Sequence, residues 1–407
     1  MSSTQEEDHK MQAQATEARL KEDILDILTC CINCRFCLPS CPLFEITQGE
    51  VTQGASGITR ALYYAVKWNE IDREVLGELR NILYSCMTCR NCEVACKNLS
   101  TGTKLLDAIE KGRELLIEKL IGPMPKQKRT LESLYLYGNP NDMLPADRQA
   151  WLSGLNVSSF GPETDVLLYV GCTAPHDLEA QGMAFRLVEL LKRAGIRFGI
   201  IGDEICCGRP ALDMGESGEG GLFEDISGKN IARLASLGVK HVVTLSPHCF
   251  DTFRNRYPEE KMKGIKIQHY TQFLSDLIEK GQLKFAKSIE KKVVYHDPCY
   301  LGRYNSIYDE PRRVLESIPG LGLGEFARAR EDSLCCGGGG GRMFTDFEAE
   351  IGRLGNIRAK EALDAGADTI VTACPWCKIN LVDGVKIAGI EESVSVIDLA
   401  ELCMKAL

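Results

Sequence analysis

The sequence lacks any long hydrophobic run. No apolar stretch among its 407 residues approaches the ~20 residues that are needed to span a bilayer. The N-terminal stretch, MSSTQEEDHKMQAQATEARLKED, is polar and charged, without the apolar segment of a secretory signal peptide. We therefore expect a cytoplasmic chain with no transmembrane segment of its own, whose contact with a membrane, if any, runs through a partner.

Positive charge and nucleotide-binding motifs are also scarce. The 48 Lys and Arg residues against 57 Asp and Glu give a net charge of −9, and no dense basic patch occurs, which argues against nucleic-acid binding. No G-x-G-x-x-G sequence opens a βαβ unit, so we expect no flavin on this chain. The glycine run 337–341 lacks the Lys and Ser/Thr that follow a phosphate-binding loop. We interpret it as backbone that approaches a cofactor closely.

Cysteine, in contrast, is abundant, with 19 residues. In a reducing compartment, dense cysteine indicates metal binding or catalysis rather than disulfides. Soft thiolate ligands select iron–sulfur clusters, zinc or Cu(I). The hydrophobic content of 44% and the charged content of 26% are typical of a globular protein, and the length allows two to four domains.

Two cysteine runs near the N-terminus share one spacing, C-x2-C-x2-C-x3-C. This is the run that binds [4Fe–4S] clusters in two-cluster ferredoxins, where the fourth cysteine ligates the other cluster. Two zinc knuckles are the alternative, but the repeated match to the ferredoxin spacing favours iron–sulfur. We predict two [4Fe–4S] cubanes, the first held by Cys31, Cys34, Cys37 and Cys96 and the second by Cys86, Cys89, Cys92 and Cys41.

A unit of about 128 residues occurs twice in the second half of the chain, a self-similarity that indicates repeated domains. Its cysteines are Cys172, Cys206, Cys207 and Cys249 in the first copy, and Cys299, Cys335, Cys336 and Cys377 in the second. The second copy has a fifth cysteine, Cys374, where the first has Ser246. Adjacent cysteines cannot easily bond each other, and their spacing suits neighbouring iron atoms. We interpret the second set as five thiolates around one large cluster.

Hydrophobic periodicity indicates the fold. Apolar residues recur at helical steps through 54–86 and 103–122, so the cluster-binding N-terminal part should be mostly α-helical. Each repeat alternates strands and helices, with its cysteines just after strand ends, which predicts parallel βαβ units. We interpret the final stretch, VIDLAELCMKAL, as a closing helix. The sequence predicts a multidomain protein with a tail (1–20), an α-helical ferredoxin-like domain (21–121), a Pro- and Gly-rich linker (122–162) and two tandem α/β domains (163–290 and 291–407).

With these parts, the chain resembles heterodisulfide reductase. Its N-terminal half is similar to the small C-type subunit with two cubanes, its C-terminal half is similar to the catalytic B-type subunit with two cysteine-rich CCG domains, and the fused order is that of the D-type subunit. Iron–sulfur subunits of glycolate and lactate oxidases also look like this. The resemblance implies a noncubane [4Fe–4S] cluster at the five cysteines 299–377. With Ser246 in the fifth place, the first CCG site could hold a second noncubane cluster, an ordinary or distorted one, or none.

Two functions are consistent with this resemblance. In one, a disulfide substrate is reduced at the noncubane cluster by electrons that arrive through the cubanes. In the other, the chain is an electron conduit between a flavoprotein (an electron-transferring flavoprotein, or an acyl-CoA or 2-hydroxy-acid dehydrogenase) and a partner protein or quinone. Both imply redox partners in a hetero-oligomeric complex, and Ser246 favours the second. Candidate proton donors to a departing thiolate are His176, His248 and His296, each of which could instead make a structural hydrogen bond.

Overall fold

The computed structural model describes residues 3–68, 72–96, 104–345, 347 and 354–407. The chain forms two compact units. The first comprises 1–131, 210–224 and 339–351, and the second comprises 132–209, 225–338 and 352–407. The first unit therefore includes the N-terminal part and, in addition, one segment that follows each predicted CCG cysteine pair.

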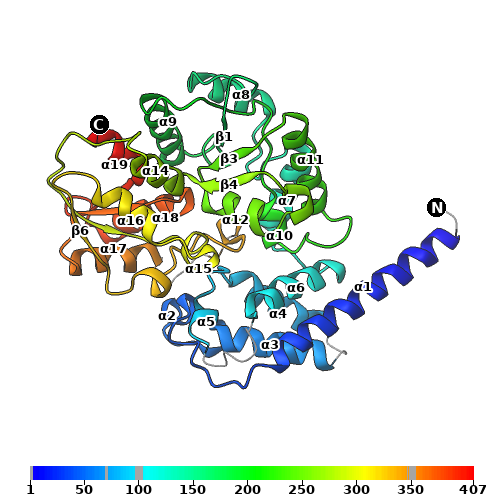
Figure 1. The fold of residues 1–407 in the computed structure, drawn as a ribbon. Helices are drawn as coiled ribbons and strands as arrows, with labels where there is room; N and C mark the ends of the chain where they lie inside the picture. Colours follow the sequence, from blue (N-terminus) through cyan, green and yellow to red (C-terminus); the bar gives the residue numbers. More distant parts are fainter. Residues whose placement is uncertain (1–2, 69–71, 97–103, 346, 348–353) are drawn as a thin grey trace. The chain divides into compact units, whose positions relative to one another are not determined.

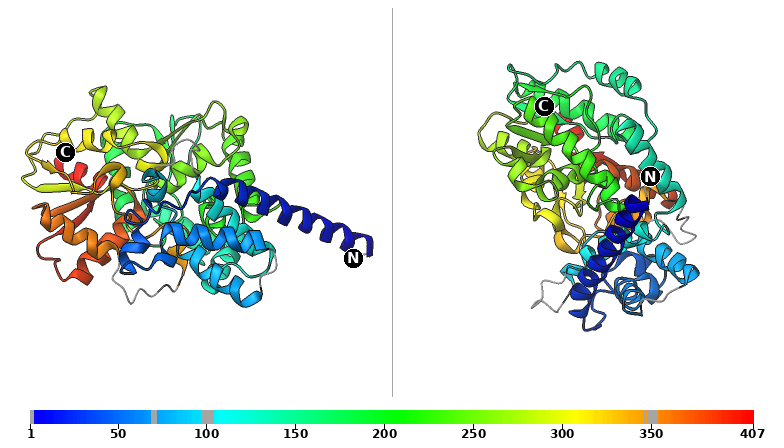
Figure 2. Two further views of the ribbon diagram at one scale, coloured as in Figure 1. Left: turned by 90° about the horizontal axis from the view of Figure 1, so that it is seen from below. Right: turned by 90° about the vertical axis from the view of Figure 1, so that its right-hand side faces the viewer.

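The first unit is built from helices in the part of the chain that is described. Its longest helix, α1 (Ser3–Thr29), buries Leu20, Ile24 and Leu28. This spacing of four places the three side chains on one face, which packs on α6 and α3. The N-terminal half of α1, part of the predicted tail, extends away from these helices (Figure 2). The remaining helices are α2 (Pro42–Ile46), α3 (Ala55–Trp68), α4 (Arg73–Ser85), α5 (Asn91–Val94), α6 (Leu105–Glu118) and α10 (Arg209–Asp213).

The stretch that we expected to be loop carries two helices, α7 (Pro125–Tyr137) and α8 (Pro145–Gly154). The expectation of loop structure was wrong there, because Pro125 and Pro145 stand at the start of helices instead of interrupting them. Proline is tolerated in the first turn, where its missing N–H has no intrahelical partner.

Two four-stranded parallel sheets form the second unit, as the repeats predicted. In both, the second strand along the chain lies at one edge and the first strand lies next to it. Figure 1 shows β1, β3 and β4 of the first sheet side by side. Corresponding strands also pair in corresponding registers: Leu167 lies opposite Val242, and Val294 opposite Ile370. The first sheet has the order β2 (Phe198–Gly199), β1 (Val166–Tyr169), β3 (His241–Thr244) and β4 (Lys266–His269); the second has β6 (Gly322–Gly324), β5 (Lys292–Tyr295), β7 (Thr369–Thr372) and β8 (Ser395–Asp398).

Helices connect the strands, as expected for parallel sheets. Helix α9 begins at the Asp177 cap, whose side chain accepts hydrogen bonds from the N–H groups of Glu179 and Ala180, and it is followed by Gly195, which has a φ of 67°. The helices of this unit include α9 (Leu178–Arg193), α11 (Leu222–Ser236), α12 (Pro247–Asn255), α13 (Glu259–Met262), α14 (Tyr270–Glu279), α15 (Gly302–Asn305), α16 (Asp309–Glu316), α17 (Leu354–Asp364), α18 (Pro375–Ala388) and α19 (Leu399–Ala406).

The closing stretch was predicted as one helix, which is wrong for its first residues. Ser395–Asp398 form strand β8, which pairs with β7, and only Leu399–Ala406 form helix α19. The β-branched Val396 and Ile397 fit a pleated strand, and the Asp398 carboxylate caps α19 by accepting from the Ala400 N–H.

One hydrophobic core runs through both repeats. Val166, Val243 and Leu187 of the first repeat belong to the same buried cluster as Val371 and Leu402 of the second. The two CCG repeats are therefore one compact body. In each sheet, the second strand lies on one side of the first strand and the third strand lies on its other side. Open α/β sheets bind ligands at the carboxyl ends of the strands where the strand order changes sides in this way.

Candidate iron–sulfur sites

The two ferredoxin-type runs have the same backbone shape. In the first run Asn33 and Arg35 have positive φ angles of 54° and 63°; in the second, Thr88 and Arg90 have 48° and 65°. These positions match when the two runs are aligned on their cysteines. Left-handed backbone is uncommon outside glycine, so its recurrence shows that both runs wind in the same way between their cysteines.

Each run contributes three cysteines to one cavity and its fourth cysteine to the other. Cys31, Cys34 and Cys37 share a cavity with Cys96, whereas Cys86, Cys89 and Cys92 share a second cavity with Cys41. The structure thus brings together the thiols that the crossed spacing grouped.

The two cavities differ in exposure. Cys34, in the first, is exposed, and its neighbours Ile32 and Phe36 are 70% and 58% exposed. Cys41, Cys89 and Cys92, in the second, are buried. The first cavity therefore reaches the protein surface, and the second lies in the helical core of its unit.

Burial opposes ionisation of these thiols. It raises the pKa of Cys37 to about 12, and the nearby Cys31 adds to the increase. Burial also raises the pKa of Cys86 to about 12 and that of Cys92 well above its usual value. Iron binding requires thiolates and releases their protons. The four-sulfur donor sets and the matching cavities fit a cationic metal core that would stabilise several thiolates at once.

In the second CCG repeat, thiols converge at the carboxyl edge of the sheet. Cys336 accepts hydrogen bonds from Cys335, Cys377 and His296, which lower its pKa well below the usual value despite burial. Burial raises the pKa of Cys374, but hydrogen bonds from Cys377 and His248 outweigh this effect and lower it to about 6. Cys374 and Cys377 also lie at the N-terminus of α18, where the helix dipole favours thiolates. Cys299 is buried just beyond β5.

The first CCG repeat has the same arrangement with four thiols. Cys207 accepts hydrogen bonds from Cys206 and Cys249, and Cys206 also contacts Cys172. Ser246 is buried, but its Oγ accepts a hydrogen bond from the N–H of His248 at 3.3 Å and so caps α12. The hydroxyl in the fifth position is therefore used within the helix terminus.

The three candidate histidines have different surroundings. His296 is buried with its ring nitrogen within 4.8 Å of the sulfur atoms of Cys336 and Cys377, and its Nδ1 accepts a hydrogen bond from Arg358 at 3.3 Å. His248 contacts Cys374, and its ring centroid lies 4.2 Å from that of Tyr300. His176 is exposed. The structure thus brings two of the three to the second CCG site.

Buried ion pairs behind each CCG site were missed by the sequence analysis. Arg148 binds Glu204 at 2.7 Å, and Glu204 also accepts from the N–H groups of Val170 and Gly171, just before Cys172. In the second repeat, Arg312 binds Asp297 at 2.7 Å. Asp297 could have been found from its place in HDPC, beside Cys299. Arg148 carries no such signal, because it lies 56 positions from its partner.

A polar network also joins the two repeats near their cysteines. Arg209, two residues after Cys207, donates to the Tyr300 hydroxyl at 2.6 Å and to Asp251 at 3.1 Å. Tyr300 follows Cys299 directly. The network therefore connects backbone next to one cysteine set with backbone next to the other.

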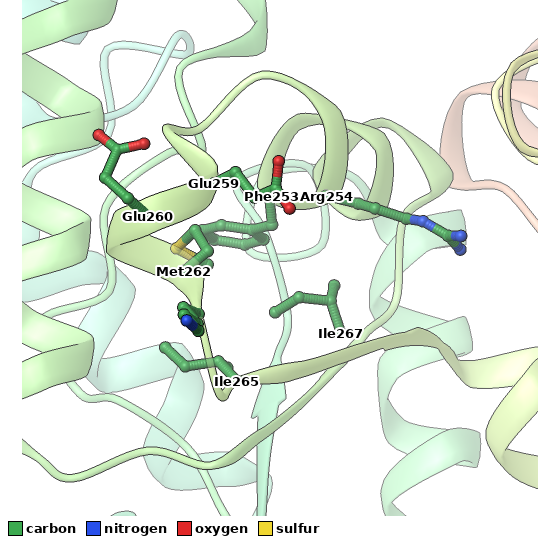
Figure 3. A pocket seen from close by; sticks show the side chains of 8 residues that line it. Phe253, Arg254, Glu259, Glu260, Met262, Ile265 and Ile267 are labelled. Atoms are coloured by element: carbon green, nitrogen blue, oxygen red, sulfur yellow. The ribbon is translucent and has the colours of Figure 1, made fainter.

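A separate groove of about 590 Å³ lies on the first repeat, between helices α12 and α13 and strand β4 (Figure 3). Its lining is mixed: Phe253, Met262, Ile265 and Ile267 are apolar, and Arg254, Glu259, Glu260 and Lys263 are charged. None of these lining residues is a cysteine, so the groove is distinct from the thiol sites.

Family models match both parts of the chain. A 4Fe-4S dicluster domain matches residues 27–99, and a cysteine-rich CCG domain matches residues 166–254 and 293–382. The D-type subunit of dihydromethanophenazine:CoB–CoM heterodisulfide reductase from Methanosarcina barkeri is 30% identical over 93% of this chain and 94% of its own length. The fold, the cysteine sites and these family models define a protein with a 4Fe-4S dicluster domain and two cysteine-rich CCG domains. More narrowly, the chain belongs to the family of the D-type heterodisulfide reductase subunits.

Two longer relatives match over only part of their length. The probable iron-sulfur-binding oxidoreductase FadF of Bacillus subtilis is 33% identical over 79% of this chain, and the EtfAB:quinone oxidoreductase of Syntrophomonas wolfei is 34% identical over 80%. The chain spans 46% of the length of each. A crystal structure of a hypothetical protein from Helicobacter pylori, 12% identical, shares the fold with a TM-score of 0.54 over 87% of this chain and 67% of its own.

Within the described residues, no helix combines the length and the apolar character needed to cross a bilayer.

Proposed function

We propose that this chain carries single electrons from a flavoprotein partner, through two cubane sites, to a noncubane site in its second CCG repeat. A [4Fe–4S] cluster supplies the chemistry of reversible one-electron transfer when it is bound. The proposed cubane ligands are Cys31, Cys34, Cys37 and Cys96 for the first and Cys86, Cys89, Cys92 and Cys41 for the second; those of the noncubane site are Cys299, Cys335, Cys336, Cys374 and Cys377.

The crossed sharing of cysteines supports the cubane assignment. Each cavity contains four thiols and no carboxylate or imidazole among its lining residues. Such a set of soft donors suits iron–sulfur or zinc. The ferredoxin spacing and the matching dicluster family model favour iron–sulfur.

In the second CCG repeat, the protein's contribution is to hold thiolates at the end of a helix. The α18 N-terminus and the hydrogen bonds from His248 and His296 stabilise negative charge on Cys374 and Cys336. For the first repeat we propose a site with four thiolates, Cys172, Cys206, Cys207 and Cys249, because Ser246 is used as a helix cap.

The conduit function is supported by one difference between the repeats, the residue at the fifth position. The resemblance to heterodisulfide reductase implies that a substrate disulfide is cleaved between two five-thiolate sites, and in this chain the first site has Ser246 in place of the fifth thiol. We therefore infer that electrons leave the second CCG repeat for a partner protein or a quinone. The similarity to the EtfAB:quinone oxidoreductase supports a flavoprotein of the electron-transferring type as the donor.

Disulfide reduction is the second candidate, because all five cysteines of the second repeat are present and the chain belongs to the D-type subunit family. In that reaction a disulfide takes up two electrons and two protons, its S–S bond breaks, and two thiols are released. The electrons would come singly from the flavoprotein partner. His296, beside Cys336 and Cys377, is near enough to the thiols to supply a proton.

Anaerobic EPR with an iron and sulfide count tests both candidates. Four sites of the [4Fe–4S] type would give about sixteen iron atoms per chain, and three would give about twelve. A paramagnetic species that appears only when thiol is added during stepwise oxidation would support disulfide chemistry and contradict the conduit. Reduced-cubane signals without a thiol-dependent species, together with reduction by an electron-transferring flavoprotein, would support the conduit. Zinc in place of iron would overturn both.

A further inference from the structure

Arg113 is a buried cation that has no role in the electron path proposed above. It lies in α6, outside both cysteine runs, and its side chain is 0% exposed. Burying a charge is costly unless the charge is paired or well hydrogen-bonded. The charge of Arg113 therefore needs stabilising partners within the first unit.

The guanidinium group makes five hydrogen bonds to four carbonyl oxygens. Its Nε and Nη2 atoms donate to Leu83 at 3.2 and 2.7 Å, and Nη2 also donates to the carbonyl of Cys86 at 2.7 Å. Nη1 donates to Asp213 at 2.6 Å and to Gly340 at 3.0 Å. Because all four acceptors are neutral peptide oxygens, these bonds satisfy the donors without cancelling the charge.

These carbonyls come from three parts of the chain that meet in the first unit. Leu83 and Cys86 lead into the second ferredoxin run, Asp213 lies six residues after Cys207, and Gly340 lies four residues after Cys336. Gly340 has a φ of 64°, and a Cβ atom there would clash with the Cys86 carbonyl. Arg113 therefore fastens the segments that follow both CCG pairs onto the backbone of one cubane site.

The guanidinium group of Arg113 lies beside this site, because its Nη2 atom donates to the carbonyl of Cys86, a residue that lines the cavity. Its positive charge therefore favours negative charge at this site. No carboxylate of the described residues lies within ion-pair distance of Arg113, so its field is not neutralised locally. Reducing a cluster adds one negative charge, and a cation in a low-dielectric interior stabilises that charge more than an exposed cation does.

Among the described residues, the other cubane site has a weaker counterpart. Arg35 lines its cavity, as Arg90 lines the second, but Arg35 is exposed. Arg60 donates to the carbonyl of Cys31 at 3.5 Å, and its side chain is only half-buried. Because Cys34 is exposed, water and salt screen this site. The two sites thus have related ligands but unequal positive charge near them.

We propose that Arg113 is a positioning residue that makes the site of Cys41, Cys86, Cys89 and Cys92 the easier of the two cubane sites to reduce. Electrons then reside mainly at this site, to which the segment that follows Cys336 is attached. This inference rests on the proposed cubane sites. It adds a direction to the electron path, from the exposed site to the buried one.

Redox titration of the purified chain, followed by EPR, tests the proposal without any partner protein. In Arg113→Gln, the ratio of reduced to oxidised second site at a fixed potential should fall about tenfold, which is about 59 mV for a one-electron couple. The first site, in the same sample, should change by less than about threefold. In the matched variant Arg60→Gln, only the first site should shift, and by less than about threefold because it is screened.

Arg113→Lys separates charge from hydrogen bonding and is the deciding variant if Arg113→Gln does not retain its iron. With the charge kept, its second site should stay within about threefold of the wild-type ratio. A tenfold loss in Arg113→Lys, or equal shifts of both sites in Arg113→Gln with iron retained, would overturn the proposal. Failure of a flavoprotein to reduce the chain would count against the proposed function but would leave this titration unchanged.

Discussion

The two CCG repeats show how one fold can present two different thiol sites. Their sheets have the same strand order, and in both the second cysteine of the adjacent pair accepts hydrogen bonds from the neighbouring thiols. They differ at the N-terminus of the helix that follows the third strand. Ser246 caps α12 with its side chain, whereas Cys374 begins α18 without a side-chain cap. The fifth thiol therefore replaces a helix cap.

The residues behind the cysteines differ as well. In the first repeat, Glu204 precedes the cysteine pair and holds the backbone before Cys172; in the second, Asp297 precedes Cys299 and binds Arg312. Each repeat thus supports its thiol site with a buried Arg–carboxylate pair, but the carboxylate comes from a different loop. Both repeats therefore have a buried ion pair behind the thiols, but the carboxylate of the pair lies at a different position in each repeat.

The largest expected effect comes from removing the central thiol of each repeat. Cys336→Ser should abolish the site in the second repeat, and Cys207→Ser should abolish the one in the first, each with a loss of about four iron atoms per chain. Iron and sulfide assays with EPR measure this. Unchanged iron content in Cys207→Ser alone would show that the first repeat holds no cluster, and the comparison would then be between a filled and an empty site.

Exchanging the fifth position should alter the type of cluster rather than the amount of iron. Cys374→Ser should give the second repeat the spectrum of the first, and Ser246→Cys should add a second species like that of the wild-type second repeat. Ser246→Cys should also cost about 1 kcal/mol, because a helix cap is lost. EPR spectra and urea midpoints of both variants measure these effects. Spectra that do not change would show that the fifth residue is not a ligand in either repeat.

Breaking the buried ion pairs should destabilise both repeats similarly. Arg148→Met leaves Glu204 buried and uncompensated, and Arg312→Met does the same to Asp297, so each should cost about 3–5 kcal/mol. The exposed pair of Arg197 with Asp165, whose side chains are 64% and 59% exposed, is the control. Arg197→Met should cost less than about 1 kcal/mol. Anaerobic urea unfolding compares the three, and equal costs would contradict this prediction.

The smallest effect concerns two caps at equivalent places, His269 on α14 and Asp398 on α19. Burial lowers the pKa of His269 from 6.5 to about 3, so its contribution to stability is lost as pH falls from 6.5. Burial, with help from Glu401, raises the pKa of Asp398 from 3.8 to about 7, so its contribution is lost as pH rises toward 7. Between these values the two slopes oppose each other.

Replacing either titratable side chain with asparagine, which can still cap a helix, should therefore expose the slope of the other. In Asp398→Asn, stability should fall with acidification by up to about 1.4 kcal/mol per pH unit, and in His269→Asn it should rise. Urea midpoints at about pH 5 and about pH 6.5 measure both slopes. Parallel curves for the two variants would contradict the assignment of opposite titrations to equivalent positions.

Much of the fold follows from the sequence because its signals are local. Apolar periodicity predicted the helices α3, α4 and α6, and the alternation of strands and helices predicted the parallel sheets. The edge strands β4, β6 and β8 were not predicted, because their sequences KIQH, GLG and SVID lack the apolar run of the central strands and they become strands by pairing with a neighbour. The helices α7 and α8 were missed because proline is compatible with both a loop and a helix start.

By itself the sequence predicted which thiols belong together, because short cysteine spacings keep thiols close in any fold. The structure groups the thiols of the two ferredoxin-type runs in this way. Only the tertiary structure decided what surrounds them. Arg113, His248 and Glu204 lie far along the chain from some of the groups they contact, and no spacing rule connects them. Packing brought these charges and hydrogen bonds into low-dielectric surroundings, where they act on the thiols most strongly.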